Sequence, residues 1–146
     1  MEFRAVTAED VPALFVVRVA TRENALSREA LARQGVTEES LRAMLGSSHR
    51  GWLCQADGRV VGFAMGNGTT GELWVLAVLP EYEGRGIGSR LLRLAEDWLW
   101  SLGWAELWLW TSPQPGRRAR QLYGRRGWTE ASVRDGRLLM KKTRPG

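Results

Sequence analysis

The sequence is poor in the residues that build disulfides, metal sites and nucleophilic triads. It has one cysteine, Cys54, and one histidine, His49, among 146 residues. One thiol cannot form an internal disulfide, and a histidine without cysteines beside it gives no metal-ligand cluster. The sequence suggests neither a Ser-His-Asp nor a Cys-His arrangement. We therefore expect no bound metal and no serine or cysteine nucleophile.

Long apolar runs are also absent. No stretch approaches the roughly 20 apolar residues of a membrane span, and the opening Met-Glu-Phe-Arg lacks the apolar segment of a secretory signal. Hydrophobic residues make up 44% of the chain and charged residues 25%, which is ordinary for a globular protein. The length predicts one domain, residues 1–146, and these features together predict a cytoplasmic location.

Positive charge is present in excess. The formal net charge is +5, and five arginines lie between Arg117 and Arg126. This cluster is compatible with a nucleic-acid surface, with recruitment of an anionic cofactor that carries phosphates, or with a solvated helix face. The last two explanations are compatible with each other and are preferred, so we expect neither nucleic acid nor membrane as a partner.

Tryptophan is the other excess, with eight residues. Most fall in predicted strands or on a predicted helix, where they are expected to fill the core. Trp100 is the exception, because helical spacing places it with Arg93 and Glu96 on the polar side. We expect Trp100 to be partly exposed, which is compatible with a homodimer contact there.

Hydrophobic spacing and turn residues predict a mixed α/β fold. Asp57-Gly58 between two apolar runs is a strong hairpin signal. The predicted strands are Phe3–Val6, Gly51–Ala56, Arg59–Met65, the run from Glu72, Ala105–Trp110, Trp128–Val133 and Arg137–Lys142. The predicted helices follow Thr7, span Glu29–Gln34 and Glu38–Leu45, follow Gly88, and span Arg117–Arg126. This order predicts a mixed sheet with helices on both faces and a right-handed parallel crossover over 72–110.

The chain is organised around one strand, one glycine-rich loop and one helix. An apolar run over Leu73–Leu79 ends at Pro80, and Gly84-Arg85-Gly86-Ile87-Gly88 precedes a helix whose apolar residues share one face. The first amides of a helix lack intrahelical partners and carry the positive end of its dipole. Glycines let those amides converge on a phosphate, and Arg85 adds a charged donor. A pyrophosphate is therefore the expected ligand.

Two familiar phosphate loops do not match. The P-loop needs Gly-Lys-Ser/Thr at the helix start, which is missing, and the Rossmann fingerprint needs a third glycine where Ser89 stands. The segment Val78-x-Pro80-x-Tyr82-x-Gly84-Arg85-Gly86-Ile87-Gly88 resembles the acyl-coenzyme A loop of the GCN5-related N-acetyltransferases, the GNAT family. That family usually has Gln-x-x-Gly-x-Gly/Ala, with Arg as the other common first residue. Glu83 takes that first place, so we expect it to contribute backbone only.

A second segment carries the same resemblance. Arg117-x-Ala119-x-x-Leu122-Tyr123-x-x-x-Gly127-Trp128 is similar to the late family motif Asn-x-x-Ala-x-x-Phe-Tyr-x-x-x-Gly-Phe, with the usual Asn falling on Gly116. The resemblance implies the GNAT fold, a mostly antiparallel twisted sheet with a central parallel β-α-β crossover. It also implies acetyl-CoA as co-substrate.

The resemblance assigns cofactor contacts mainly to backbone. The strand end is expected to pair with the pantetheine arm, the Leu76 amide to polarise the thioester, and the loop to hold the diphosphate. The implied cofactor residues are Leu76, Ala77, Val78, Glu83, Gly84, Arg85, Gly86, Ile87, Gly88 and Ser89.

Two residues are expected to move protons. Tyr123 is predicted to be the general acid, because a phenol with a pKa near 10 can protonate a thiolate whose conjugate acid has a pKa near 8.5; the alternative is a core tyrosine. Glu72 is predicted to be the general base, and the alternatives are an exposed strand-end acid, Glu23 in that role, or a water relay. Residues 19–50 should shape the acceptor pocket, with Arg22, Glu23 and Asn24 as its polar contacts.

The function expected from these residues is acetyl transfer from acetyl-CoA to a primary amine of a small molecule or peptide. Direct attack in a ternary complex is the expected route. A CoA-binding regulatory module without catalysis stays open as the alternative, because Glu83 and Gly116 depart from the family pattern.

Overall fold

In this computed structural model the residues described are 1–21, 27–114 and 117–145. The strands are β1 (Glu2–Ala5), β2 (His49–Ala56), β3 (Arg59–Asn67), β4 (Glu72–Val78), β5 (Glu106–Thr111), β6 (Thr129–Arg134) and β7 (Arg137–Thr143). The helices are α1 (Val11–Ala20), α2 (Arg28–Arg33), α3 (Glu38–Leu45), α4 (Ile87–Ser101) and α5 (Arg118–Arg125), with short 3-10 turns at Ala8–Asp10 and Pro80–Tyr82.

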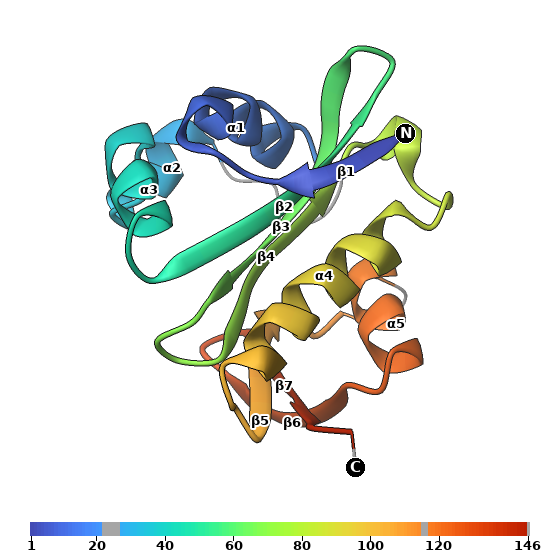
Figure 1. The fold of residues 1–146 in the computed structure, drawn as a ribbon. Coiled ribbons are helices and arrows are strands. Elements are labelled where there is room, and N and C mark those ends of the chain that lie inside the picture. Colours follow the sequence, from blue (N-terminus) through green and yellow to red (C-terminus); the bar gives the residue numbers. More distant parts are fainter. Residues whose placement is uncertain (22–26, 115–116, 146) are drawn as a thin grey trace.

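The seven strands form one mixed sheet in the order β1-β2-β3-β4-β5-β7-β6. Of the pairings between these described strands, β4 with β5 is the parallel one and the others are antiparallel. Helix α4 connects β4 to β5 and packs against β2, β3 and β4. Figure 1 shows α1, α2 and α3 on one side of the sheet and α4 and α5 on the other. The predicted fold class is therefore confirmed.

The core lies where the apolar side of α4 meets the sheet. Leu91, Leu92, Ala95 and Leu99 are fully buried, as helical spacing requires of one face. Glu96 is also buried, although the same spacing placed it on the polar side. In α1 the buried residues are Val11, Leu14, Phe15 and Val17, whereas Val19 is 39% exposed. Within the described residues no helix is long and apolar enough to cross a membrane.

Strand β4 leaves its neighbour β5 soon after it begins. The two strands share a single register pair, Glu72 with Trp108. On the other side of β4, Val75 stands opposite Met65 and Leu73 opposite Gly66, so Trp74 is an extra, bulged residue. A bulge increases local twist and bends its strand. The later part of β4 therefore lacks a paired strand on the β5 side, which is where the site lies.

Candidate active site

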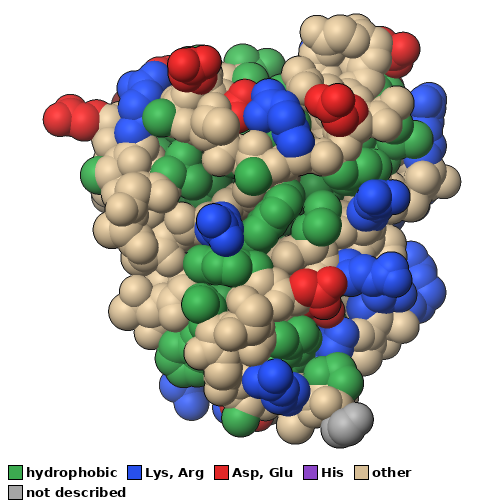
Figure 2. Space-filling model, viewed as in Figure 1, with side chains coloured by type: hydrophobic (Ala, Val, Ile, Leu, Met, Phe, Trp, Pro, Cys, Tyr) green, Lys and Arg blue, Asp and Glu red, His purple; other side chains and the backbone are tan. Residues whose placement is uncertain are grey.

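Two hollows meet at Leu76 on β4. The smaller, which we call the loop groove, has a volume of about 180 Å³ and lies between the end of β4, the loop before α4, and α5. The larger, which we call the acceptor cavity, has a volume of about 520 Å³ and lies between α1, β4, β5 and the β6–β7 turn. Leu76 lines both. Figure 2 shows the face that Figure 1 turns toward the reader, where hydrophobic side chains lie between the upper and lower parts of the molecule with basic side chains among them.

The loop before α4 has the backbone that phosphate binding requires. Gly84 and Gly86 have φ values of +77° and +81°, a region that side chains other than glycine rarely adopt. Gly86 is the residue before α4, and its carbonyl accepts from the Arg90 amide at 3.1 Å. The amides of Gly84 to Ser89 donate to no acceptor among the described residues. These amides thus form an unpartnered donor cluster at a helix N-terminus.

The end of β4 presents further backbone donors. The Leu79 amide donates to the Val61 carbonyl at 2.8 Å, so these two residues form a hydrogen-bonded pair of the antiparallel ladder. Such pairs alternate with pairs whose amides and carbonyls point away from each other. In this register Val78 and Leu76 are the outward residues. Their backbone groups therefore face the side where β4 has no paired strand.

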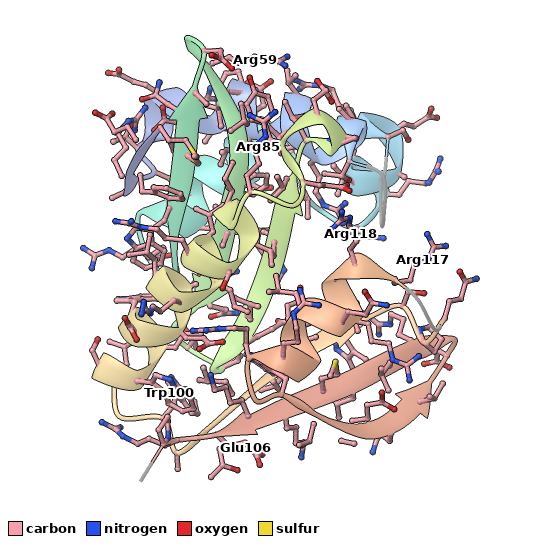
Figure 3. The ribbon with its side chains drawn as sticks, turned by 90° about the vertical axis from the view of Figure 1, so that its right-hand side faces the viewer. Arg59, Arg85, Trp100, Glu106, Arg117 and Arg118 are labelled. Carbon is pink, nitrogen blue, oxygen red and sulfur yellow. The ribbon has the colours of Figure 1, made fainter. Side chains whose placement is uncertain are left out.

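Arginines of α5 supply positive charge to the groove. Arg118 and Arg125 both line it. The Arg118 guanidinium lies 2.9 Å from the Glu83 carboxylate, across the groove from α5 to the loop. Figure 3 shows Arg118 at the start of α5, facing the loop. The carboxylate of Glu83 thus lies inside the groove and partly neutralises its nearest cation.

Arg85 is placed differently from its predicted role as a phosphate donor. Its guanidinium lies 4.8 Å from the ring centre of Tyr82 and donates to the Glu81 carbonyl at 3.2 Å. It is not among the described residues that line the groove. The Tyr82 hydroxyl donates to Asp57 at the tip of the β2–β3 hairpin, which anchors the loop to the sheet. Arg59 lies near the same ring, on the side that Figure 3 shows uppermost.

Glu72 lines the acceptor cavity and has an altered acidity. Burial raises the pKa of its carboxyl to about 7, and the positive charge of Arg137 opposes that rise. A carboxyl with a pKa near the working pH can accept a proton and release it again. Along an extended strand its Cα lies about 13 Å from that of Leu76. A proton leaving an amine near Leu76 would therefore reach Glu72 through water.

Tyr123 is 6% exposed and lines the acceptor cavity from α5. Its ring centre lies 6.0 Å from that of Trp128, and the planes are inclined at 57°. Arg18 of α1 also lines the cavity and interacts electrostatically with Tyr123, and burial lowers the pKa of the Arg18 guanidinium. The structure thus brings Tyr123, Glu72 and Leu76 to one cavity. Their catalytic roles stay predictions.

Other predicted residues fall outside the described part of the chain. These are the three expected acceptor contacts, Arg22, Glu23 and Asn24. The structure adds Arg118 and Arg125 in the groove. It also adds Arg18 and Arg137, which line the acceptor cavity. The basic run of α5 had signalled a phosphate-bearing cofactor, whereas nothing local in the sequence marks Arg18 or Arg137.

Known structures share this arrangement over almost the whole chain. PaiA N-acetyltransferase from Thermoplasma acidophilum, solved in complex with coenzyme A, has 22% identity and a TM-score of 0.82, over 99% of this chain and 100% of that one. The ribosomal-protein-S18-alanine N-acetyltransferase from Escherichia coli has 22% identity and a TM-score of 0.75, over 99% and 96%. YncA from Salmonella typhimurium, solved with acetyl-CoA, has 17% identity and a TM-score of 0.75, over 98% and 93%.

Likeness at these identities establishes the fold. The sequence matches no curated protein significantly. The model of the acetyltransferase (GNAT) family matches residues 16–128, which include the loop before α4, Glu72 and Tyr123. The chain therefore belongs to the GNAT family of acetyltransferases.

Proposed function

We propose that residues 1–146 form one N-acetyltransferase domain that transfers the acetyl group of acetyl-CoA to a primary amine of a small molecule or peptide. The observation that carries the proposal is the row of unpartnered amides from Gly84 to Ser89 beside the outward backbone of Leu76 and Val78. The amides fit a diphosphate, and the open strand edge fits an extended arm that pairs through its own amides. The single Cys54, which is a free thiol, favours the cytoplasm as location.

The chemistry needs three contributions from the chain. The outward amide of Leu76 would donate to the thioester oxygen and stabilise the charge that grows there during attack. Glu72 would take the proton of the ammonium through water, because its pKa of about 7 lets it act near neutral pH. Tyr123 would give its hydroxyl proton to the departing sulfur. A carbon–nitrogen bond forms and the carbon–sulfur bond breaks. The nitrogen loses its second proton to water as the intermediate collapses, and water then takes the proton from Glu72 and returns one to Tyr123.

The runner-up is a module that binds CoA without catalysis. The Glu83 carboxylate inside the groove would weaken the binding of the CoA phosphates. This is the observation that supports the alternative of a non-catalytic module. A catalytically idle module would not need a buried phenol and a carboxyl of raised pKa on the walls of one cavity. We therefore favour the enzyme.

The test has two stages. Acetyl-CoA at about 100 times its dissociation constant should stabilise the protein by about 2.7 kcal/mol, read as a thermal shift, and a short DNA duplex should not. Release of free CoA is then followed with a panel of primary amines. Binding with turnover supports the enzyme, binding without turnover on any amine supports the module, and absence of binding contradicts both.

A further inference from the structure

We propose that the amine accepted by this enzyme also carries a carboxylate, and that Arg137 binds this carboxylate at the rim of the acceptor cavity. The inference rests on the function proposed above and names the class of substrate for the same site. Arg137 begins β7 directly after the Asp135-Gly136 turn. Both turn residues have positive φ values, +51° and +74°, so the turn geometry is tightly defined.

The guanidinium of Arg137 is positioned by an aromatic ring, and no carboxylate among the described residues forms a salt bridge with it. It lies 4.3 Å from the ring centre of Trp110, stacked on the face of the indole. Among the described residues it has no salt bridge, although it lines the cavity. Stacking leaves the edge of the guanidinium available, and two of its N–H groups match a carboxylate. Arg137 is therefore a preorganised anion receptor.

The charges of the cavity wall favour an anion over a second ammonium. Among the residues that the structure describes, its charged lining residues are Arg18, Glu72 and Arg137. Burial raises the pKa of Glu72 to about 7, so near neutral pH this carboxyl offsets only part of the arginine charge. An acceptor with two ammonium groups, such as a diamine, would meet net repulsion. An amine that carries a carboxylate brings the missing negative charge.

The other side chains that line the cavity indicate the chemical character of the rest of the acceptor. Most other lining side chains from α1, α2, α3 and β3 are apolar, among them Leu14, Phe15, Leu31, Leu41 and Phe63. A cavity of about 520 Å³ suits a small molecule or one side chain. The acceptor that fits carries an apolar body in addition to its amine and its carboxylate.

Matched pairs of acceptors test this directly. Phenylalanine is compared with phenethylamine, in which hydrogen replaces the carboxylate, and 6-aminohexanoate with hexylamine, in which a methyl group replaces it. Cadaverine serves as the diamine. We expect the better carboxylated acceptor to exceed its partner and cadaverine by about tenfold or more in kcat/KM. Equal or faster turnover of the amines without a carboxylate would overturn the inference.

Variants test whether Arg137 causes the preference for acceptors that carry a carboxylate. Arg137→Gln should lower kcat/KM for the carboxylated acceptor by about 10- to 100-fold, mainly through KM, and for its partner by less than about threefold. Arg134→Gln is the matched control, because Arg134 faces Arg137 across the hairpin but does not line the cavity. A loss shared equally by both acceptors, or an Arg134→Gln loss equal to that of Arg137→Gln, would overturn the inference.

Failure of the proposed function would look different. No CoA release with any amine would overturn the enzyme and this inference together. Turnover of hexylamine or phenethylamine, with no gain from a carboxylate and no effect of Arg137→Gln, would remove the inference and leave the acetyltransferase standing.

Discussion

Trp128 donates its indole N–H to Glu96 over 2.7 Å, and this bond ties the segment between α5 and β6 to the middle of α4. The second carboxylate oxygen of Glu96 accepts from the Lys142 ammonium at 2.8 Å, so α4, β7 and the segment after α5 meet at one buried carboxylate. Trp128 in turn packs beside Tyr123. The predicted general acid is therefore supported by a buried ionic contact that lies outside the cavity.

The first prediction concerns that contact. Glu96→Gln should lower the free energy of unfolding by about 3–5 kcal/mol, because it leaves the mostly buried Lys142 ammonium without a counter-charge. Glu106→Gln is the control: it breaks the 3.5 Å contact with Lys141, in which both side chains are about half exposed, and should cost less than about 1 kcal/mol. Chemical denaturation measures both, and equal costs would refute the role given to Glu96.

The burial of Glu96 could not be predicted from the sequence. Helical periodicity correctly gave the buried face of α4 through Leu91, Ala95 and Leu99, but it placed Glu96 among solvent-facing residues. Lys142 and Trp128 lie far along the chain, and no local pattern announces that they converge on one carboxylate. Buried ion pairs are decided by tertiary packing, which periodicity does not contain.

The fold and the phosphate loop could be predicted better than the Glu96 contact, because short local sequence patterns specify them. The predicted hairpin turn at Asp57-Gly58 lies between β2 and β3, as expected. Gly84 and Gly86 adopt the left-handed backbone that a tight loop before a helix demands. Arg118 was expected only as a member of the basic run from Arg117 to Arg126, and Arg137 was not expected at the site. The position of each depends on a partner on another element, Glu83 for Arg118 and Trp110 for Arg137.

The second prediction addresses the loop backbone. Gly86→Ala forces a side chain into φ +81°, and Gly103→Ala does the same at φ +94°; neither added Cβ would meet an atom within 4 Å. Both should cost about 1–2 kcal/mol of stability. Only Gly86→Ala should weaken CoA binding, by about tenfold or more, because it disturbs the donor cluster. Calorimetric titration decides, and equal affinities of the two variants would contradict the assignment of the loop.

The third prediction concerns the acid in the groove. Glu83→Gln should strengthen CoA binding by about 2- to 10-fold, since it removes a negative charge near the phosphates and releases Arg118. Glu81→Gln loses an equal charge from the same loop, but Glu81 pairs with Arg59 and does not line the groove. Its dissociation constant should stay within about twofold of the parent value. Weaker binding by Glu83→Gln would show that this carboxylate helps to hold the cofactor.

The fourth prediction is a pH dependence. The pKa of Glu72 is raised from 4.5 to about 7 in the folded protein, so between these values the folded state holds a proton that the unfolded state has lost. The contribution of Glu72 to stability should therefore fall as pH rises from 4.5 to 7, by an amount on the order of 1–3 kcal/mol. Glu72→Gln should be the more stable protein at pH about 8 and match the parent at pH about 4. A gap that does not change with pH would contradict the raised pKa.

The same residue should shape the rate. As general base, Glu72 must be ionised, so kcat/KM should rise with pH and level off above a pKa of about 7. Glu72→Gln should lose this limb and about 100-fold or more in rate. A variant that keeps the parental profile would transfer the role to another group or to water.

The fifth prediction separates chemistry from binding. Tyr123→Phe keeps the ring beside Trp128 and removes the hydroxyl. It should lower kcat about 100-fold or more while the CoA dissociation constant stays within about threefold. Single-turnover rates and calorimetry give the two numbers. Parallel losses in both would assign Tyr123 to the framework of the cavity.

The most direct test of the account follows the backbone amides of Gly84 to Ser89 by heteronuclear NMR while acetyl-CoA is added. We expect the resonances of these amides, with those of Leu76 and Val78, to show the largest shifts, and the amide resonances of Gly35 and Gly103 to stay unchanged. Saturating acetyl-CoA that leaves the loop amides unmoved would contradict the account.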